Sequence, residues 1–464
     1  MAECGLNKKE VANRVVSNLK SQNFQPIGEK FDVTLDDIYN ILTSNKWKRL
    51  TMNNLTTVQG LEKNELLDLI NGREIVIWGI NDLAIDVETS LIKSNLKISG
   101  HLHSDPERVQ KQHINRKIIS TTHFFGQQHN VKDDYFIIIG TTSFASEAIE
   151  ICKDHGLRNK KDFLHGISIK RPKAIIEVVE SKTKPETNSY FGYRCNLDNI
   201  KQIENSKFIA ITEKLDTDIP LLTGIEIGLF SDALLHTSIF ELTAYAEKIA
   251  PVTIKTMLSH SADIVELANS TISRVDIFVV GLGAIYEEIN YEQWDNFVSR
   301  LSNFLELNFN SKNPSRINVT VFNVGPKNDA TSTMFLKLRS KLTKFADFKF
   351  ESPYLMPYDR VLEKLNGEVL NEKCTDNFRL LPYDLTEIAT ACLKQKGLQC
   401  VSQRIFPIIR VDCSVLLCHL YEQPTVTESY FDINYEDLVD KRHMHNHCNS
   451  CQKHGLHRFD FLVL

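Results

Sequence analysis

Short runs of consecutive apolar residues alternate with amphipathic stretches between residues 71 and 184. Residues 75–78 and 136–139 are apolar throughout, and amphipathic segments follow them at 80–95 and 143–157. Apolar runs of this length are typical of strands buried on both faces, whereas the amphipathic segments indicate helices packed on a sheet. The alternation predicts an α/β domain over residues 71–184, with a parallel sheet covered by helices on both faces.

The turn after the first strand bears on whether this Rossmann-like domain binds a nucleotide. A dinucleotide fingerprint needs Gly-x-Gly-x-x-Gly at this point, because the backbone must approach a pyrophosphate at a helix N-terminus. Residues 79–84, GINDLA, keep only Gly79 of the three glycines. Asp105 could contact a ribose hydroxyl, but the surrounding SDPE is also an ordinary turn sequence. Gly79 is the candidate cofactor-binding residue of this domain, and a structural or protein-docking role is the favoured alternative.

A second series of strand and helix patterns follows a linker that contains Pro172 and the polar stretch SKTKPETNSY. Four apolar segments, GIEIGLF, VTIKTML, VDIFVVGL and INVTVFNV, each precede an amphipathic helical pattern. One strand and one helix every 25–40 residues, roughly, are typical of a (β/α) barrel or part of one, whose active face lies at the carboxyl ends of the strands. We therefore expect a partial (β/α) barrel over residues 185–370.

The N-terminal sequence and the net charge indicate where the protein acts and which partners it does not bind. Residues 1–70 contain two short helical patterns, NKKEVANRVVSNLKSQ and TLDDIYNILTSNKW. The net charge of −5, from 54 basic and 59 acidic residues, gives no single-sign field suited to nucleic acid. The N-terminus lacks an apolar signal region and no run of about 18 apolar residues occurs, so we expect a cytoplasmic protein without a membrane span.

Cysteine is concentrated near the C-terminus. Of ten cysteines, five fall in the last 65 residues, at positions 400, 413, 418, 448 and 451. In a reducing compartment, clustered thiols indicate a metal site or catalysis more than disulfides. The segment 371–464 is therefore predicted to be a small cysteine-rich subdomain.

These features together resemble a known superfamily. The run IEIGLFSDALLHTSIFELTAYA, followed by VTIKTM, DIVELANSTISRVDIFVVGLGAIYEEI and the C-terminal cysteines, is similar to radical S-adenosylmethionine enzymes with a SPASM or twitch extension. The resemblance covers about residues 190–460. It implies a partial (β/α) barrel, a [4Fe–4S] cluster on a Cys-x-x-x-Cys-x-x-Cys loop after the first strand, and a Gly-Gly-Glu-Pro-like strand end that holds the methionine end of the cofactor.

The chain departs from the superfamily at the cluster loop. Three cysteines at the required spacing occur nowhere in the sequence. The nearest match, YRCNLDN at residues 193–199, offers Cys195 but then Asn199 and Gln202 where thiolates are needed, and an alternative first strand at 208–218 contains no cysteine. Amide oxygens bind iron far more weakly than thiolates. We expect no cluster in the barrel.

The cofactor strand is altered as well. Phe230-Ser231-Asp232-Ala233 stands where the resemblance places Gly-Gly-Glu-Pro. Asp232 keeps a carboxylate that could pair with an amino group, so Asp232 and its neighbour Ser231 are the candidate cofactor-binding residues. Met257 further replaces an asparagine of the superfamily, and Phe278 and Val280 replace polar residues. These changes from small and polar to bulky and apolar argue against binding of S-adenosylmethionine.

The C-terminal cysteines match the extension better. Cys400 and Cys418 flank a hairpin pattern with Cys413 at the place of a glycine, and Cys448-x-x-Cys451 follows. The resemblance implies that Cys400, Cys418, Cys448 and Cys451 hold one metal centre. A [4Fe–4S] cluster is favoured, and structural Zn²⁺, with four bonds of about 2.3 Å, is the alternative.

Several smaller assignments accompany this centre. Cys413 is predicted to be a small buried residue where a turn prefers glycine. His443, His445 and His447 precede Cys448 and could donate hydrogen bonds to sulfur, although histidines in a polar loop are more often solvated.

The function implied is that of an iron–sulfur protein resembling radical S-adenosylmethionine enzymes but lacking their cofactor cluster. It would be a divergent enzyme or a partner subunit in the modification of a peptide, sugar or nucleotide sugar, and a homo-oligomer is also compatible. In one alternative the C-terminal cluster is reactive, with Asp232, Glu213, Asp216 and Lys255 as acid–base groups. In the other the chain is a zinc-stabilised, non-catalytic interaction protein.

Overall fold

The computed structural model describes most of the two predicted α/β regions and part of the C-terminal segment. The described residues are 61, 63–104, 117–126, 130–141, 145–169, 171–181, 200–258, 263–290, 292–322, 329–351, 405–418 and 424–454. The helices predicted before residue 61, Asp105, the 193–199 motif and Cys400 lie outside them. Within the described residues, no helix has the length and apolarity needed to cross a membrane.

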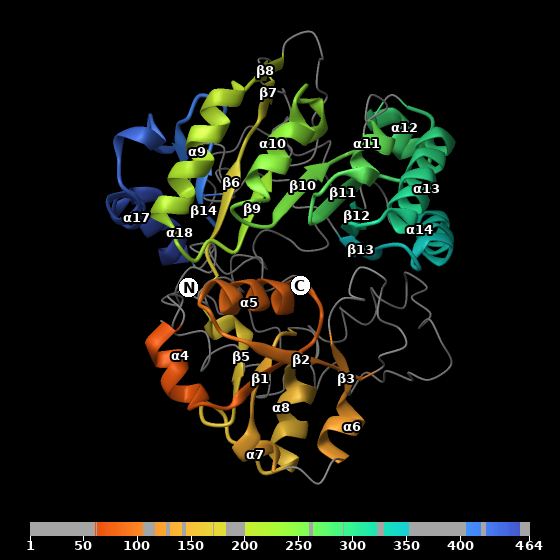
Figure 1. The fold of residues 1–464 in the computed structure, drawn as a ribbon. Helices are drawn as coiled ribbons and strands as arrows, with labels where there is room; N and C mark the ends of the chain where they lie inside the picture. Colours follow the sequence, from red (N-terminus) through yellow and green to blue (C-terminus); the bar gives the residue numbers. More distant parts are fainter. Residues whose placement is uncertain are drawn as a thin grey trace, which may run out of the picture.

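The first domain is a five-stranded parallel sheet (Figure 1). Its strand order is β3 (Ile118–Ser120), β2 (Ile98–His103), β1 (Glu74–Trp78), β4 (Tyr135–Ile139) and β5 (Phe163–His165). This is the 3-2-1-4-5 order of doubly wound α/β sheets. The apolar runs of β1 and β4 form its centre, as their sequences predict.

Helices cover both faces of this sheet because successive strand residues point to opposite sides. Ile75 and Ile77 pack with the helices α4 (Lys63–Ile70) and α5 (Asp82–Lys93). Val76 and Trp78 pack on the other side with α6 (Thr121–Gly126) and α8 (Ala145–Asp154), while the short α7 (Val131–Asp134) leads into β4. The prediction of a parallel α/β sheet is confirmed.

The second sheet has nine strands. In order they are β13 (Asp347–Glu351), β12 (Arg316–Phe322), β11 (Arg274–Val280), β10 (Val252–Thr256), β9 (Gly224–Ile227), β6 (Lys173–Ile176), β14 (Ile405–Ile409), β15 (Val415–Leu416) and β16 (Thr425–Thr427). The strands from β13 to β14 are all parallel, and β14, β15 and β16 pair antiparallel. A separate antiparallel ribbon joins β7 (Val179–Ser181) to β8 (Ile200–Gln202).

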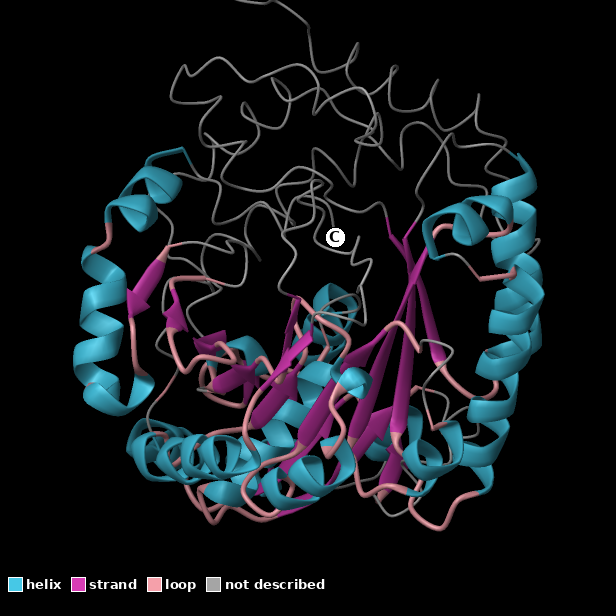
Figure 2. Cartoon of the chain, turned by 90° about the horizontal axis from the view of Figure 1, so that it is seen from above, coloured by secondary structure: helices cyan, strands magenta, loops and turns pink. Residues whose placement is uncertain are grey.

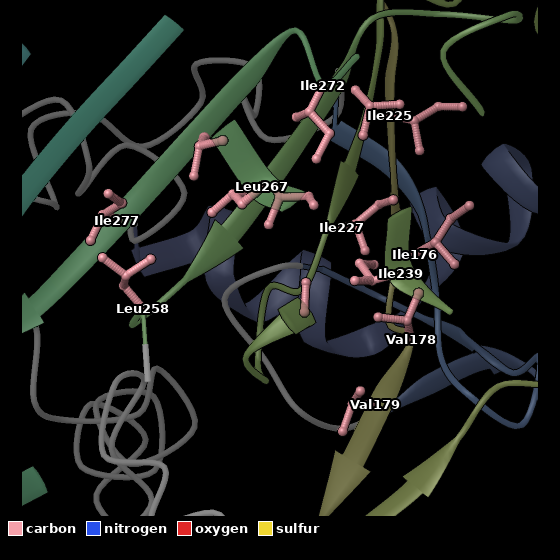
Figure 3. Packing of buried hydrophobic residues seen from close by; sticks show 14 of the residues in the cluster. Ile176, Val178, Val179, Ile225, Ile227, Ile239, Leu258, Leu267, Ile272 and Ile277 are labelled. Carbon is pink, nitrogen blue, oxygen red and sulfur yellow. The ribbon is translucent and has the colours of Figure 1, made fainter. Parts of the chain in front are cut away.

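The large sheet is curved, and its helices lie along the outer side (Figure 2). They are α9 (Asn205–Asp218), α10 (Ile239–Ala246), α11 (Ile264–Asn269), α12 (Ala284–Asn290), α13 (Trp294–Asn310) and α14 (Asp329–Leu342). Alternate strand residues such as Ile176, Ile227 and Ile277 face these helices and form the main apolar core (Figure 3). After β16 the chain continues through α17 (Tyr435–Met444) and α18 (Asn446–His454).

Two sequence assignments differ from this arrangement. Strand β6 lies in the middle of the large sheet, although its residues follow Pro172 in the expected linker, and β14 to β16 extend the same sheet. The expected boundaries at residues 184 and 370 therefore leave strands of one sheet on both sides.

Residues 208–218 are helical, in α9, so the alternative first strand is wrong. Phe208, Ile211 and Leu215 follow a helical period and are buried together.

The two sheets meet through helix α5, which lies below the amino ends of the large sheet's strands (Figure 1). Asp82 forms ion pairs with Arg274 at 2.7 Å and with Arg316 at 2.5 Å. Asp86 pairs with Lys173 at 2.9 Å, and Lys93 donates a hydrogen bond to the carbonyl of Ile249. The first domain therefore docks against the base of the second by charge complementarity.

Candidate functional site

The carboxyl ends of β6 and β9 meet at the turn that follows β9. Gly228 begins this turn with a φ of +83°, and a Cβ there would lie 2.7 Å from the backbone oxygen of Ser231. Only glycine fits without displacing the backbone. The turn therefore brings residues 229–232 close over the strand ends, where the predicted cofactor-binding residues lie.

Asp232 is buried and fixes the turn to the next strand. One carboxylate oxygen accepts a hydrogen bond of 3.0 Å from the backbone N–H of Leu234 and so caps a short 3-10 helix, η5 (Ala233–Leu235). The other accepts a hydrogen bond of 3.2 Å from the N–H of Met257, just after β10. Both oxygens of the predicted amine ligand thus bind the protein's own backbone.

Ser231 contacts a carboxyl group that the sequence analysis did not single out. Its hydroxyl lies 3.0 Å from Oε2 of Glu177 and 2.7 Å from the carbonyl oxygen of Val179. Oε1 of Glu177 accepts hydrogen bonds from the N–H groups of Leu229, at 2.5 Å, and Phe230, at 3.0 Å. The available signal was an acidic residue inside the apolar run KAIIEVVE, because a carboxyl group buried among apolar residues requires partners.

The environment of Glu177 shifts its proton affinity. The side chain is only 4% exposed. Burial raises the pKa of its carboxyl to about 7, against the lowering effect of the hydrogen bonds from Phe230, Leu229 and Ser231 and of the Lys255 cation. Glu177 is therefore a buried acid that can change protonation near neutral pH.

Another charged cluster lies on the same face of the sheet. Glu226 of β9 pairs with Lys255 at 2.7 Å and with Lys173 at 3.7 Å. Burial alone would raise the pKa of Glu226, but the Lys255 and Lys173 cations hold it well below its usual range. The predicted acid–base residue Lys255 is thus part of a structural ion pair.

The other predicted acid–base groups lie on α9, away from these strand ends. Glu213 accepts a hydrogen bond of 2.7 Å from the Tyr245 hydroxyl. Asp216 acts electrostatically on Lys93 of α5, where burial lowers the lysine pKa and Asp216 raises it. These contacts link helices and do not bring the two carboxylates to Asp232.

Gly79 lies at the end of β1 with a φ of +118°. Its N–H donates to the carbonyl of Leu102, and its carbonyl contacts a ring nitrogen of His101 at 2.8 Å. At the N-terminus of α5, where a pyrophosphate would lie, Asn81 caps the helix and Asp82 pairs with the arginines of the second domain. The N-terminus of α5 is thus occupied by contacts within the chain, and a cofactor role for Gly79 stays a prediction.

The C-terminal thiols are only partly placed. Cys448 and Cys451 lie one turn apart on α18 and therefore share a helix face, and Cys451 is buried. Cys418 is buried just after β15. Across the described part of the chain, no three His, Cys, Asp or Glu side chains gather as a candidate metal site. Thiolates suit a cluster or zinc, and the four-cysteine set stays a prediction because Cys400 lies outside the described residues.

The structure shows the surroundings of Cys413 and His445, which the sequence analysis discussed beside the metal ligands. Cys413 is buried and has a φ of +71° in the turn between β14 and β15. The prediction of a small buried residue at a glycine position is confirmed. His445 precedes α18, and its ring nitrogen accepts a hydrogen bond of 3.2 Å from the N–H of His447.

Comparisons with known proteins gave matches among solved structures alone. No protein-family profile and no curated protein matches the chain. Streptococcus suis SuiB bound to S-adenosylmethionine has 12% identity and a TM-score of 0.38, over 68% of this chain and 74% of that one. Native anSMEcpe with bound AdoMet has 14% identity and a TM-score of 0.38, over 60% and 86%. BtrN in complex with AdoMet and 2-DOIA has 10% identity and a TM-score of 0.31, over 61% and 88%. Similarities of this size do not assign a fold or a function.

Proposed function

We propose that the chain is a radical-S-adenosylmethionine-like protein that does not cleave S-adenosylmethionine and that carries one metal centre on its C-terminal cysteines. The observation that carries the proposal is the closed strand end after β9. Asp232 binds backbone N–H groups with both oxygens, and Ser231 binds Glu177. A cofactor amine would have to share the Asp232 oxygens with backbone N–H groups that already bind both of them. The absence of a three-cysteine loop motif from the sequence supports the same conclusion.

A protein that does not cleave S-adenosylmethionine could still bind a substrate or a partner enzyme. The chain would act as a partner subunit, or as a divergent enzyme, in the modification of a peptide, sugar or nucleotide sugar. A [4Fe–4S] cluster held by Cys400, Cys418, Cys448 and Cys451 would supply electron transfer when bound, because four thiolates would ligate all four irons. The chain's own residues hold the strand ends closed and dock the first domain against the base of the second.

The test is reductive cleavage. Anaerobically reconstituted protein is reduced and incubated with S-adenosylmethionine, and 5′-deoxyadenosine is quantified. We expect no 5′-deoxyadenosine above the level of a protein-free control.

A further inference from the structure

The turn at residues 229–231 presents three hydrogen-bonding groups to one carboxyl group. The N–H groups of Leu229 and Phe230 both reach Oε1 of Glu177, and the Ser231 hydroxyl reaches Oε2. The carboxyl group comes from the end of β6, more than 50 residues earlier in the chain. Two successive backbone N–H groups and a hydroxyl that converge on one carboxyl group are the kind of donor set that binds free carboxylates.

The hydrogen-bonding groups around Ser231 accommodate a neutral carboxyl group. The hydroxyl has one proton but two oxygen neighbours, the Val179 carbonyl at 2.7 Å and Oε2 of Glu177 at 3.0 Å. A carbonyl oxygen can only accept, so the shorter contact takes the hydroxyl proton. A neutral Glu177 can then donate to the hydroxyl oxygen, whereas an ionised Glu177 has to share the hydroxyl proton with the Val179 carbonyl. With a neutral carboxylic acid, the two backbone N–H groups, the Ser231 hydroxyl and the Val179 carbonyl each have a hydrogen-bond partner.

The surroundings favour the neutral form as well. Ile175, Ile408 and Leu416 form a buried apolar cluster against which Leu229 and Phe230 pack. An apolar environment disfavours the ionised carboxylate. The cation that acts on Glu177 is Lys255 of β10, and Lys255 is itself paired with Glu226.

We propose that residues 229–231 form a binding site for a carboxylic acid, which this chain fills in cis with Glu177. The ligand class is a small carboxylic acid or the carboxyl group of a larger molecule, held by two backbone N–H groups and one hydroxyl. The inference deepens the proposed function and rests on it, because the filled turn is what closes the strand end. The test of the carboxylic-acid site uses no S-adenosylmethionine. The site and the proposed function can therefore be disproved separately.

The test is chemical rescue of Glu177→Gly. We expect this variant to have a lower thermal unfolding midpoint than the wild type, and millimolar formate or acetate to restore much of the loss in a saturable manner, while chloride at equal ionic strength does not. Leu416→Ala is the matched control, because it opens a cavity in the same apolar cluster and leaves the carboxyl group in place. Its midpoint should fall without a response to formate.

Glu177→Gln gives a second readout that does not depend on a cavity. The glutamine amide keeps a carbonyl acceptor for the two N–H groups and an N–H donor for Ser231, as a neutral acid does. Burial raises the folded pKa of Glu177 to about 7, so its contribution to stability is full below the unfolded pKa and is lost as the pH rises through the folded value. The wild type should therefore lose stability relative to Glu177→Gln as the pH rises from about 4.5 to about 7, and the difference should level off above that.

Two results would overturn the proposal. One is a Glu177→Gly variant that folds and whose midpoint does not respond to formate or acetate. The other, which applies even if that variant fails to fold, is a Glu177→Gln stability profile parallel to that of the wild type between acidic and mildly alkaline pH.

Discussion

Cys413 illustrates how a single residue departs from the conformation its type prefers. It has a left-handed backbone, with a φ of +71°, in the tight turn that joins β14 to β15. Its N–H donates to the carbonyl of Arg410, and its carbonyl accepts from the N–H of Tyr430. A side chain in this conformation destabilises the backbone, and glycine would not.

We predict that Cys413→Gly is more stable than Cys413→Ala by about 1 kcal/mol, because both remove the thiol and only glycine relieves the left-handed strain. Chemical denaturation of the two variants measures the difference. Equal stability would mean that the turn relaxes to a conformation that alanine accepts, contrary to the φ described for Cys413.

The sequence reveals Cys413 but not Glu177, because the signal for Cys413 is local and the partners of Glu177 are distant along the chain. A cysteine at a glycine position is a local signal, visible in DCS between two apolar runs. The partners of Glu177 lie 52 to 54 residues further along the chain. Only the pairing of β6 with β9 brings them together, and local patterns do not encode this pairing.

At the scale of elements, helix α5 joins the two sheets. Its first residue, Asp82, bridges Arg274 of β11 and Arg316 of β12. Arg274 also binds Asp276 in a two-pronged contact, and Arg316 reaches Asp347. Asp82 is the carboxylate that the two arginines share, and its loss would remove both of these ion pairs between α5 and the large sheet.

Removal of that carboxylate should therefore destabilise the fold. We predict that Asp82→Ala lowers the free energy of unfolding by about 1–3 kcal/mol, below the range for a fully buried pair because a third of the Asp82 side chain is exposed. Denaturant unfolding measures the change.

A surface ion pair on the same domain serves as the control. Glu150 and Lys153 of α8 are both about half exposed, so Glu150→Ala should change stability by less than about 0.5 kcal/mol. Equal effects of Asp82→Ala and Glu150→Ala would contradict the docking role of α5.

The pattern of elements was largely predictable, and their pairing was not. The apolar runs that become β1, β4, β9, β10, β11 and β12 stand out because each is bounded by turn residues and followed by a helical period. Strand β6 has only four residues and follows Pro172, which resembles a linker, although proline is accepted before a strand. Its place between β9 and β14 depends on contacts across more than 200 residues.

At the scale of the whole molecule, the C-terminal segment belongs to the large sheet and also holds the predicted metal ligands. β14 pairs with β6 in parallel, and Cys418 follows β15 of the same sheet. A metal centre on these cysteines would therefore be linked to the strands that carry Glu177 and Asp232. Metal binding and folding of this segment should be coupled.

This coupling gives a prediction about metal content. After anaerobic reconstitution we expect about four irons per chain if the centre is one [4Fe–4S] cluster, and Cys448→Ala should lose most of them and destabilise the segment. Cys152→Ala is the control, because Cys152 is a buried thiol of the first domain whose pKa burial raises to about 12. Elemental analysis gives the count, and one zinc without iron would favour the zinc alternative. Unchanged metal in Cys448→Ala would contradict the ligand assignment.

Whether the strand end after β9 is closed to the cofactor can be measured as production of 5′-deoxyadenosine from S-adenosylmethionine by the reduced, reconstituted chain. The wild type and Asp232→Ala are compared with a protein-free control. We expect no product above that control for either protein. Product formed by the wild type and lost in Asp232→Ala would contradict it, because Asp232 would then bind the cofactor and not only the backbone of Leu234 and Met257.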